Sequence, residues 1–148
     1  MIRSAVATWK GGPGAGEGSV STSSGVISNA LYSFGSSTGN EPCTSPTEML
    51  AAAVASCMSL MVTQEMAKAG LKQEYVTTES VLTLEEQKGR WEITGIALNV
   101  TAGIHDMDAE KLRRASMSAK HKCPISRALN IPVKMTLNLQ SPVHAEAA

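Results

Sequence analysis

The sequence predicts an α+β fold in one domain of residues 1–148. β-branched segments typical of strands lie on both sides of a long alanine-rich segment, and that segment has helix signals at each end. In addition, 43% of the residues are hydrophobic, which is enough for one core in a chain of this length. Aromatic residues make up only 3%, so we expect the core to consist of Val, Ile, Leu, Ala and the eight methionines.

An N-terminal meander of strands is expected over residues 1–40. Residues 2–9 mix β-branched and aromatic side chains, and two further strands are predicted around a turn at Ser24–Gly25. The glycine-rich residues 10–18 are expected to form a turn. They lack the GxxxxGK[ST] pattern and a helix directly after it, so we do not expect them to bind phosphate.

A long central helix is predicted over residues 46–69. Ser45 suits the N-cap, Pro46 suits the first helical position, and Glu48 completes a capping box with Ser45. Gly70 is the residue type that commonly follows the last helical turn. These local signals define both ends of the element that carries Cys57.

A long hairpin is predicted over residues 74–103. Its two segments alternate β-branched with polar residues, and the turn residues at 87–89 lie between them. After a second helix, a last strand is expected over 131–140, and residues 141–148 are typical of a frayed tail.

The second helix is predicted over residues 106–123, with Asp106 or Asp108 as its cap. The helical spacing that supports it is formed by Met107, Leu112, Ala115 and Met117. Pro124 interrupts this pattern directly after Cys123.

The charge balance argues against a nucleic-acid partner. Thirteen basic residues balance thirteen acidic ones, and no basic cluster is interleaved with aromatic residues.

The N-terminus lacks the apolar run of a secretory signal, and we expect no stretch to be long enough to span a bilayer. The sequence therefore predicts a cytoplasmic protein without membrane insertion.

Three cysteines, Cys43, Cys57 and Cys123, are too few and too scattered for a disulfide framework. In a cytoplasmic protein thiols are reduced by default, which still allows a transient redox disulfide. Cys43 stands in a loop beside a proline and is interpreted as incidental, although it is able to form adventitious disulfides.

Cys57 lies in the middle of the apolar run of the long helix. A helical wheel at about 100° per residue places it on a face with Leu50, Val54, Leu60 and Met61, and places Glu48 on the opposite side. The helix start is roughly 16 Å away, so its partial charge is too distant to lower the pKa of this thiol. A reactive thiolate at Cys57 therefore needs a cation or hydrogen-bond donors from another segment.

Purely structural roles are alternatives to the chemical roles of the cysteines and methionines. Cysteine packs as a small hydrophobe, so Cys57 also suits a core position, and the methionines of this helix suit adaptable core packing. His121 and Cys123, with Cys43, Cys57 and His105, are conceivable metal ligands. The tight cysteine pair of structural zinc sites is missing, so no metal is expected.

Three stretches of the chain resemble the OsmC/Ohr family of osmotically inducible and organic-hydroperoxide-resistance proteins, and the resemblance covers almost the whole chain. "GSVSTSSGVI" is similar to the second and third strands of the family, and "TSPTEMLAAAVASCMS" to its proline-started helix with the first cysteine. "AKHKCPIS" is similar to the motif of the second cysteine. The resemblance implies antiparallel sheets packed around the central helix in an intertwined homodimer, with the active sites at the subunit interface.

The resemblance also implies a thiol peroxidase without metal or organic cofactor. Cys57 would be the peroxidatic residue, reducing an alkyl or lipid hydroperoxide to an alcohol and becoming a sulfenic acid. Cys123 would resolve it as an intramolecular disulfide, which an external dithiol then reduces. This chemistry is consistent, because a sulfenic acid condenses readily with a neighbouring thiol.

The sequence departs from the family at the arginine and glutamate that orient the thiolate, since Ser37 and Thr47 occupy those positions. Candidate replacements are Glu48, expected mainly as a capping residue, and Arg127 and His121. Lys122 is a further candidate because it adjoins Cys123. The alternative function is an OsmC-fold protein with little or no peroxidase activity, which binds a small hydrophobic or acyl ligand or acts as a redox sensor.

Overall fold

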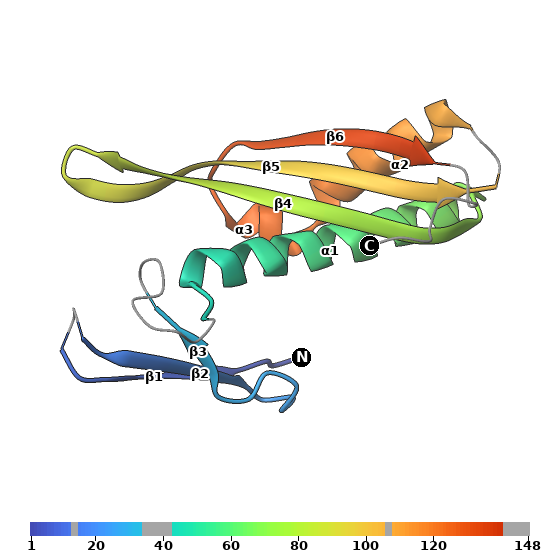
Figure 1. Cartoon of the computed structure of the whole chain (residues 1–148). Helices are drawn as coiled ribbons and strands as arrows, with labels where there is room; N and C mark the ends of the chain where they lie inside the picture. The colour runs from blue at the N-terminus through green and yellow to red at the C-terminus, as the bar shows by residue number, and fades with distance from the viewer. Residues whose placement is uncertain (13–14, 34–42, 106–107, 141–148) are drawn as a thin grey trace. The chain divides into compact units, whose positions relative to one another are not determined.

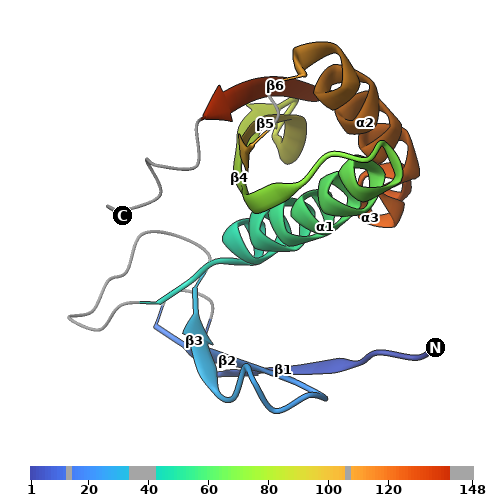
Figure 2. The same cartoon turned by 90° about the vertical axis from the view of Figure 1, so that its right-hand side faces the viewer.

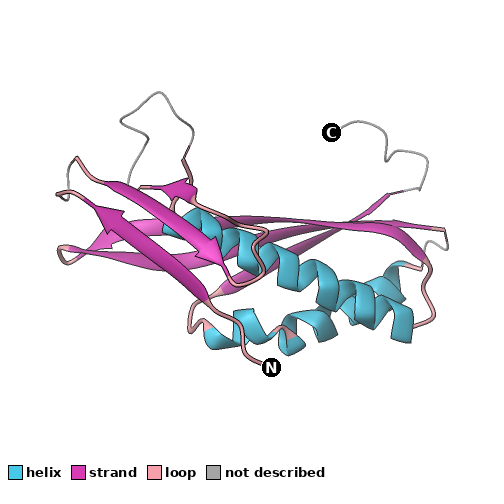
Figure 3. Cartoon of the chain, turned by 90° about the horizontal axis from the view of Figure 1, so that it is seen from below, coloured by secondary structure: helices cyan, strands magenta, loops and turns pink. Residues whose placement is uncertain are grey.

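A computed structural model describes residues 1–12, 15–33, 43–105 and 108–140. The chain divides into two compact units, Met1–Leu50 and Ala51–Ala148, and each is described by itself. Helices and strands are both present in quantity, which confirms the α+β class (Figure 3). The single-domain organisation stays a prediction.

The first unit holds the expected meander. Strands β1 (Ala5–Lys10), β2 (Glu17–Thr22) and β3 (Ala30–Tyr32) form an antiparallel sheet in the order β1-β2-β3 (Figure 1). The Trp9 ring packs against Tyr32, with ring centroids 6.0 Å apart. Gly18 makes room for this pair, because a Cβ there would lie 2.7 Å from the Tyr32 ring.

This first sheet has almost no core of its own. Among the described residues of the unit, Val20 is the one buried apolar side chain, and all six residues of β1 are exposed. Val6 is 69% exposed, and the other large apolar side chains on the surface of the unit are Met1, Ile2, Trp9, Val26 and Ile27. An apolar surface of this kind is typical of an interface.

Helix α1 (Pro46–Lys68) begins and ends at the predicted signals. The Ser45 hydroxyl accepts a hydrogen bond from the Glu48 N–H, and the Glu48 carboxylate accepts one from the Ser45 N–H, at 3.1 and 3.2 Å. This is the capping box. At the other end Gly70 has a φ of +73°, and the N–H of Leu71 donates to the carbonyl of Met66 in a Schellman motif.

The second unit contains a sheet in the order β4-β5-β6. Strands β4 (Gln73–Gln87) and β5 (Arg90–Ile104) form the predicted hairpin, whose turn residues Lys88 and Gly89 both have positive φ. Strand β6 (Val133–Gln140) pairs with β5 in the parallel direction. This differs from the antiparallel sheets that we expected, and the reason is that the connection from β5 to β6 runs through helices, which return the chain to the same end of the sheet.

Helices cover one face of this second sheet (Figure 2). They are α1, α2 (Ala109–Lys122) and the short α3 (Pro124–Ala128). Buried side chains alternate along β5 and recur at helical spacing on α1 and α2. The core of the second unit is formed mainly by Val54, Met58, Val62, Met66, Ile96, Leu98, Val100, Ala102, Leu112, Ala115 and Ala119.

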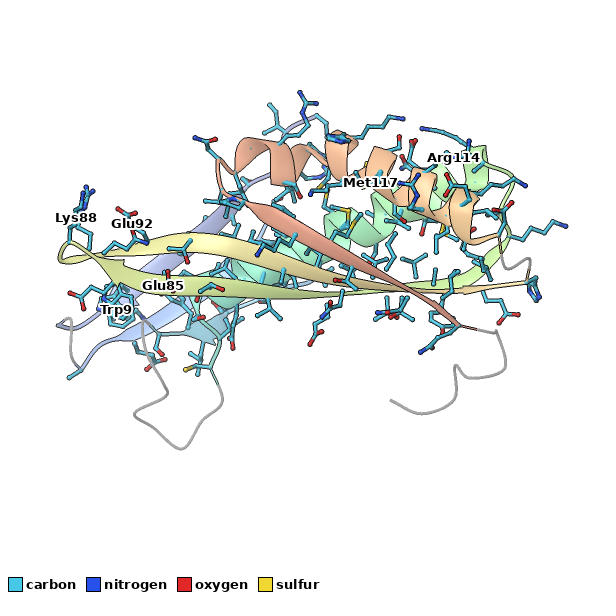
Figure 4. The ribbon with its side chains drawn as sticks, turned by 90° about the horizontal axis from the view of Figure 1, so that it is seen from above. Trp9, Glu85, Lys88, Glu92, Arg114 and Met117 are labelled. Carbon is cyan, nitrogen blue, oxygen red and sulfur yellow. The ribbon has the colours of Figure 1, made fainter. Side chains whose placement is uncertain are left out.

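The second helix is shorter than predicted. Its N-cap is Asp108, whose carboxylate accepts a hydrogen bond from the Lys111 N–H; Asp106 and Met107 lie outside the described residues. Leu112 and Ala115 are buried as expected, but Met117, labelled on α2 in Figure 4, is 44% exposed, so its predicted core position is wrong. Spacing alone did not separate the edge of the buried face from its centre. The predicted tail, residues 141–148, also lies outside the described residues.

Helix α1 is long and apolar enough to cross a membrane by length and composition. This corrects the expectation that no stretch is long enough to do so. Core helices of soluble proteins pass the same test, and here Met58, Val62 and Met66 are fully buried inside the structure.

Candidate redox site at Cys57 and Cys123

Two cysteines that are 66 positions apart meet in the second unit. The Sγ atoms of Cys57 and Cys123 lie 2.9 Å apart, in hydrogen-bond contact, and both thiols are free. A disulfide bond is about 2.05 Å long, so the sulfurs need to move by less than 1 Å to form one. The pair is therefore placed for reversible oxidation.

Helix α1 presents Cys57 at the edge of its buried face. The buried residues of α1 are Val54, Met58, Val62, Glu65 and Met66, a stripe centred about 100° from Cys57. Leu60, which the helical wheel placed on the same apolar face as Cys57, is 62% exposed. The predicted orientation is corrected: Cys57 is half-buried, and the helix is apolar around most of its circumference, so periodicity could not identify the buried side.

Cys123 lies at the junction of two helices. Its N–H donates to the Ala119 carbonyl at 2.9 Å as the C-cap of α2, and its Sγ accepts from the Ser126 N–H at 3.5 Å as the N-cap of α3. Pro124 forces this break, because it occupies the first position of α3 and cannot continue α2. Cys123 is fully buried, so Cys57 is the more accessible thiol of the pair.

The pKa values of the two thiols are shifted in opposite directions. Burial raises the pKa of Cys57, and the neighbouring Cys123 thiol raises it further, while the Ile125 N–H opposes both. Burial also disfavours the Cys123 thiolate, but hydrogen bonds from Cys57 and Ser126 outweigh it and the pKa of Cys123 is lowered. The proton between the sulfurs can belong to either atom, so the pair loses its first proton as a unit.

The side chains predicted to activate the thiol, those of Arg127, His121 and Lys122, have partners or surroundings other than the two sulfurs. Within the described residues, no Lys, Arg or His side chain donates a hydrogen bond to either sulfur. Arg127 and His121 line a surface hollow of about 250 Å³ together with Ser126, and the Lys122 ammonium pairs with Glu65. Besides the contact between the two thiols, backbone N–H groups of α3 donate hydrogen bonds to the sulfurs.

The positions of the family arginine and glutamate lie near the start of α1 in the sequence. The Thr47 hydroxyl forms a hydrogen bond with that of Ser45, and the Glu48 carboxylate accepts from Thr44 and Ser45, so Glu48 caps the helix. Ser37 lies outside the described residues. An activating role for Glu48, Arg127 or His121 stays a prediction.

Glu65 is the residue near this site that the sequence interpretation missed. Its carboxylate is buried on α1 among Val62 and Met66 and has three hydrogen-bond partners, Lys68, Ser118 and Lys122. A charged residue inside an apolar helical stripe was the available signal. Within the described ranges, no three His, Cys, Asp or Glu side chains come together as a metal site requires.

The fold and the thiol pair define a class of protein, an α+β protein in which two free thiols that are far apart in the sequence lie within hydrogen-bond distance. The model of the family described as OsmC-like protein matches residues 38–138. The chain belongs to this family. It is 30% identical over 135 residues to Peroxiredoxin OsmC of Escherichia coli K12, with 91% of this chain and 94% of the relative covered.

Solved structures share the fold. The OsmC-like protein of unknown function from Vibrio cholerae matches with a TM-score of 0.76 and 21% identity, over 93% of this chain and 99% of that chain. The organic hydroperoxide resistance protein OhrB of Bacillus subtilis matches with a TM-score of 0.66 and 24% identity, over 93% and 98% of the two chains. The names of the relatives support a peroxidase-type role at the level of the family, which involves a hydroperoxide and a reductant in general terms.

Proposed function

We propose that this protein is a cysteine-based peroxidase that reduces organic, alkyl or lipid, hydroperoxides to alcohols. The observation that supports this most is the 2.9 Å separation of the free thiols of Cys57 and Cys123. Peroxide reduction by two thiols needs a nucleophile that the peroxide reaches and a second thiol beside it. Cys57 is half-buried and Cys123 is fully buried, which suits the first and the second role.

In the first step the pair has lost one proton and reacts in the form in which the remaining proton lies on Cys123, so that the Cys57 thiolate attacks the distal oxygen of the hydroperoxide. The S–O bond forms, the O–O bond breaks, and the departing alkoxide takes a proton and leaves as the alcohol. The Cys123 thiol, the hydrogen-bond partner of Cys57, supplies this proton. Donating this proton leaves Cys123 as the thiolate, which agrees with the lowered pKa of Cys123.

In the second step the Cys123 thiolate attacks the Cys57 sulfenic sulfur. The S–S bond forms, the S–O bond breaks, and hydroxide takes up a proton and leaves as water. One hydroperoxide and two thiols thus give one alcohol, one water and one disulfide. An external dithiol returns both cysteines to thiols by exchange and is itself oxidised to a disulfide.

A homodimer in the cytoplasm is the state that we propose for the active protein. The exposed apolar side chains of the first unit, with Val6 and Ile2 among them, and the lack of a core in that unit support a second copy as their cover. Leu60, nearly one helical turn from Cys57 and 62% exposed, supplies apolar surface that favours a hydrophobic hydroperoxide.

The test is the number of dithiol equivalents that the reduced protein oxidises with cumene hydroperoxide, compared with hydrogen peroxide. We expect many turnovers, preference for cumene hydroperoxide, and loss of turnover in Cys57→Ser. In Cys123→Ser the sulfenic acid has no resolving thiol, so we expect one rapid oxidation and then slow turnover limited by the external dithiol.

A second function is favoured by one observation, namely that among the described residues no Lys, Arg or His side chain donates a hydrogen bond to either sulfur. Without a cation the Cys57 thiolate is less populated, which suits a redox sensor or a protein that binds a hydrophobic or acyl ligand. Oxidation of a single equivalent supports the sensor, and no oxidation supports the binding protein. Either outcome contradicts the peroxidase.

A further inference from the structure

A buried carboxylate joins the two helices that carry the thiols. Glu65 on α1 is only 8% exposed. One of its oxygens, Oε2, accepts hydrogen bonds from the Ser118 hydroxyl at 2.6 Å and the Lys122 ammonium at 2.7 Å, both on α2. The other oxygen, Oε1, accepts from Lys68 on α1 itself. We call Glu65, Ser118 and Lys122 the helix clamp.

The helix clamp and the thiol pair lie along the same interface. Helices α1 and α2 run in opposite directions, as Figure 1 shows by the course of the chain. Glu65 follows Cys57 by eight residues, about 12 Å along α1, and Ser118 precedes Cys123 by five residues on α2. The two helices are therefore tied at two points, by the clamp and by the contact between the sulfurs.

Lys122 makes the link between the two points direct, because it is the residue before Cys123 and the last residue of α2. Its hydrogen bond to Glu65 holds the last turn of α2 against α1. Cys123 is the C-cap of that turn and has little freedom of its own, since its N–H donates to Ala119 and its Sγ accepts from Ser126. The position of this last turn therefore determines the position of the Cys123 sulfur.

We propose that Glu65 is a positioning residue that, through Lys122 and Ser118, holds the Cys123 thiol within reach of Cys57. This inference rests on the proposed function, because it concerns the disulfide step of that mechanism. Glu65 does not touch the sulfurs, and its effect is on the effective concentration of one thiol at the other. A displacement of about 1 Å at a reacting group reduces a rate by up to about 100-fold.

The clamp persists over the pH range in which thiols react. Hydrogen bonds from Lys122, Lys68 and Ser118 lower the pKa of Glu65 to about 2, so the carboxylate stays ionised while the thiols titrate. Charge-assisted hydrogen bonds of this kind are stronger than neutral ones. The clamp therefore acts as a permanent tie and not as a pH switch.

The test measures the equilibrium between the thiol pair and glutathione. The reaction is one protein dithiol plus one glutathione disulfide giving one protein disulfide plus two glutathione thiols, and its equilibrium constant is the effective concentration of the pair. It is measured by mass spectrometry after acid quenching, in full-length protein carrying Cys43→Ser. Unfolding of the reduced and oxidised forms is measured in parallel.

Two lysine variants give a matched comparison. Lys122→Met and Lys68→Met each remove one cation from the same carboxylate, but only Lys122 connects α1 with α2. We expect Lys122→Met and Glu65→Gln to lower the effective concentration between about tenfold and 100-fold. We expect Lys68→Met to stay within about twofold of the parent, and Lys122→Arg to retain most of the parent value because it keeps the charged donor.

A merely structural role gives a different result. If the clamp only stabilises the fold, Lys122→Met destabilises the reduced and oxidised forms equally and leaves the glutathione equilibrium unchanged, which overturns the proposal. Equal effects of Lys122→Met and Lys68→Met overturn it as well. Failure of the proposed function is separate, since a protein that shows the clamp effect with glutathione but does not turn over hydroperoxide refutes only the peroxidase.

Discussion

A disulfide between Cys57 and Cys123 is expected to raise the free energy of unfolding. The increase should be nearly the full amount that the chain-entropy relation gives for the loop that the disulfide closes. The disulfide closes a loop of 66 residues, for which the chain-entropy relation gives about 4 kcal/mol at 25 °C. Strain in the folded state reduces this value in many disulfides, but here the sulfurs are already 2.9 Å apart in the reduced protein. Little backbone movement is needed, so little of the stabilisation is lost.

The assay is urea unfolding of the oxidised and the reduced protein, both carrying Cys43→Ser, at pH 7 and at one protein concentration. The concentration is fixed because association of two copies also shifts the transition. A difference of about 4 kcal/mol corresponds to roughly a thousandfold higher tendency to form the disulfide in the folded than in the unfolded chain. In Cys57→Ser the oxidised and reduced samples should unfold alike.

An oxidised protein that is no more stable than the reduced one would refute this reasoning. It would mean that the disulfide distorts the helices around it. The short distance between the two sulfurs in the reduced protein would then not indicate that a disulfide forms there without strain. A difference that persists in Cys57→Ser would show that the effect does not come from an intramolecular disulfide, because Cys123 is the one cysteine left in that variant.

Three further predictions follow from the surroundings of the site. Burial raises the pKa of Cys57 most and the hydrogen bond with Cys123 raises it further, so in Cys123→Ala, which removes that partner, the midpoint of the Cys57 alkylation rate against pH should move down; an unchanged midpoint contradicts the described hydrogen bond. The pKa of Glu65 is lowered from 4.5 to about 2 on folding, so the stabilisation by its carboxylate is complete above pH 4.5 and is lost as the pH falls to about 2. In Glu65→Gln the melting temperature should therefore fall less steeply between pH 4.5 and 2 than in the parent, and an equally steep fall would disprove the contribution of Glu65. Met66→Ala should lower the unfolding free energy by about 2–5 kcal/mol, while Met117→Ala should change it by less than about 0.5 kcal/mol, and equal effects would contradict their burial.

Local signals in the sequence predicted the elements that depend on local chemistry. Ser45 and Glu48 form the capping box, and Gly70 ends α1 with a positive φ, because each of these features needs only a few adjacent residues. The hairpin over β4 and β5 was predicted from alternation, and its turn requires the positive φ that Gly89 readily adopts.

Features that depend on tertiary packing could not be predicted from the pattern of apolar and polar residues in the sequence. The wheel assigned Leu60 to the buried face, but an alanine-rich helix offers an apolar surface on nearly every side, and the sheet decides which side it covers. The meeting of Cys57 and Cys123 was expected from the family resemblance and not from spacing. Glu65 was missed because its partners, Ser118 and Lys122, come from a helix more than fifty residues away in the sequence.

The central claim is that Cys57 and Cys123 act on hydroperoxide as one pair. The most direct test treats the reduced protein with a single equivalent of cumene hydroperoxide, quenches the reaction with acid and an alkylating agent, and identifies the oxidised cysteines by peptide mass spectrometry. The account predicts one product, the peptide pair joined by a Cys57–Cys123 disulfide, with Cys43 alkylated. Recovery of both cysteines alkylated, or of Cys57 oxidised while Cys123 is recovered alkylated, would contradict it.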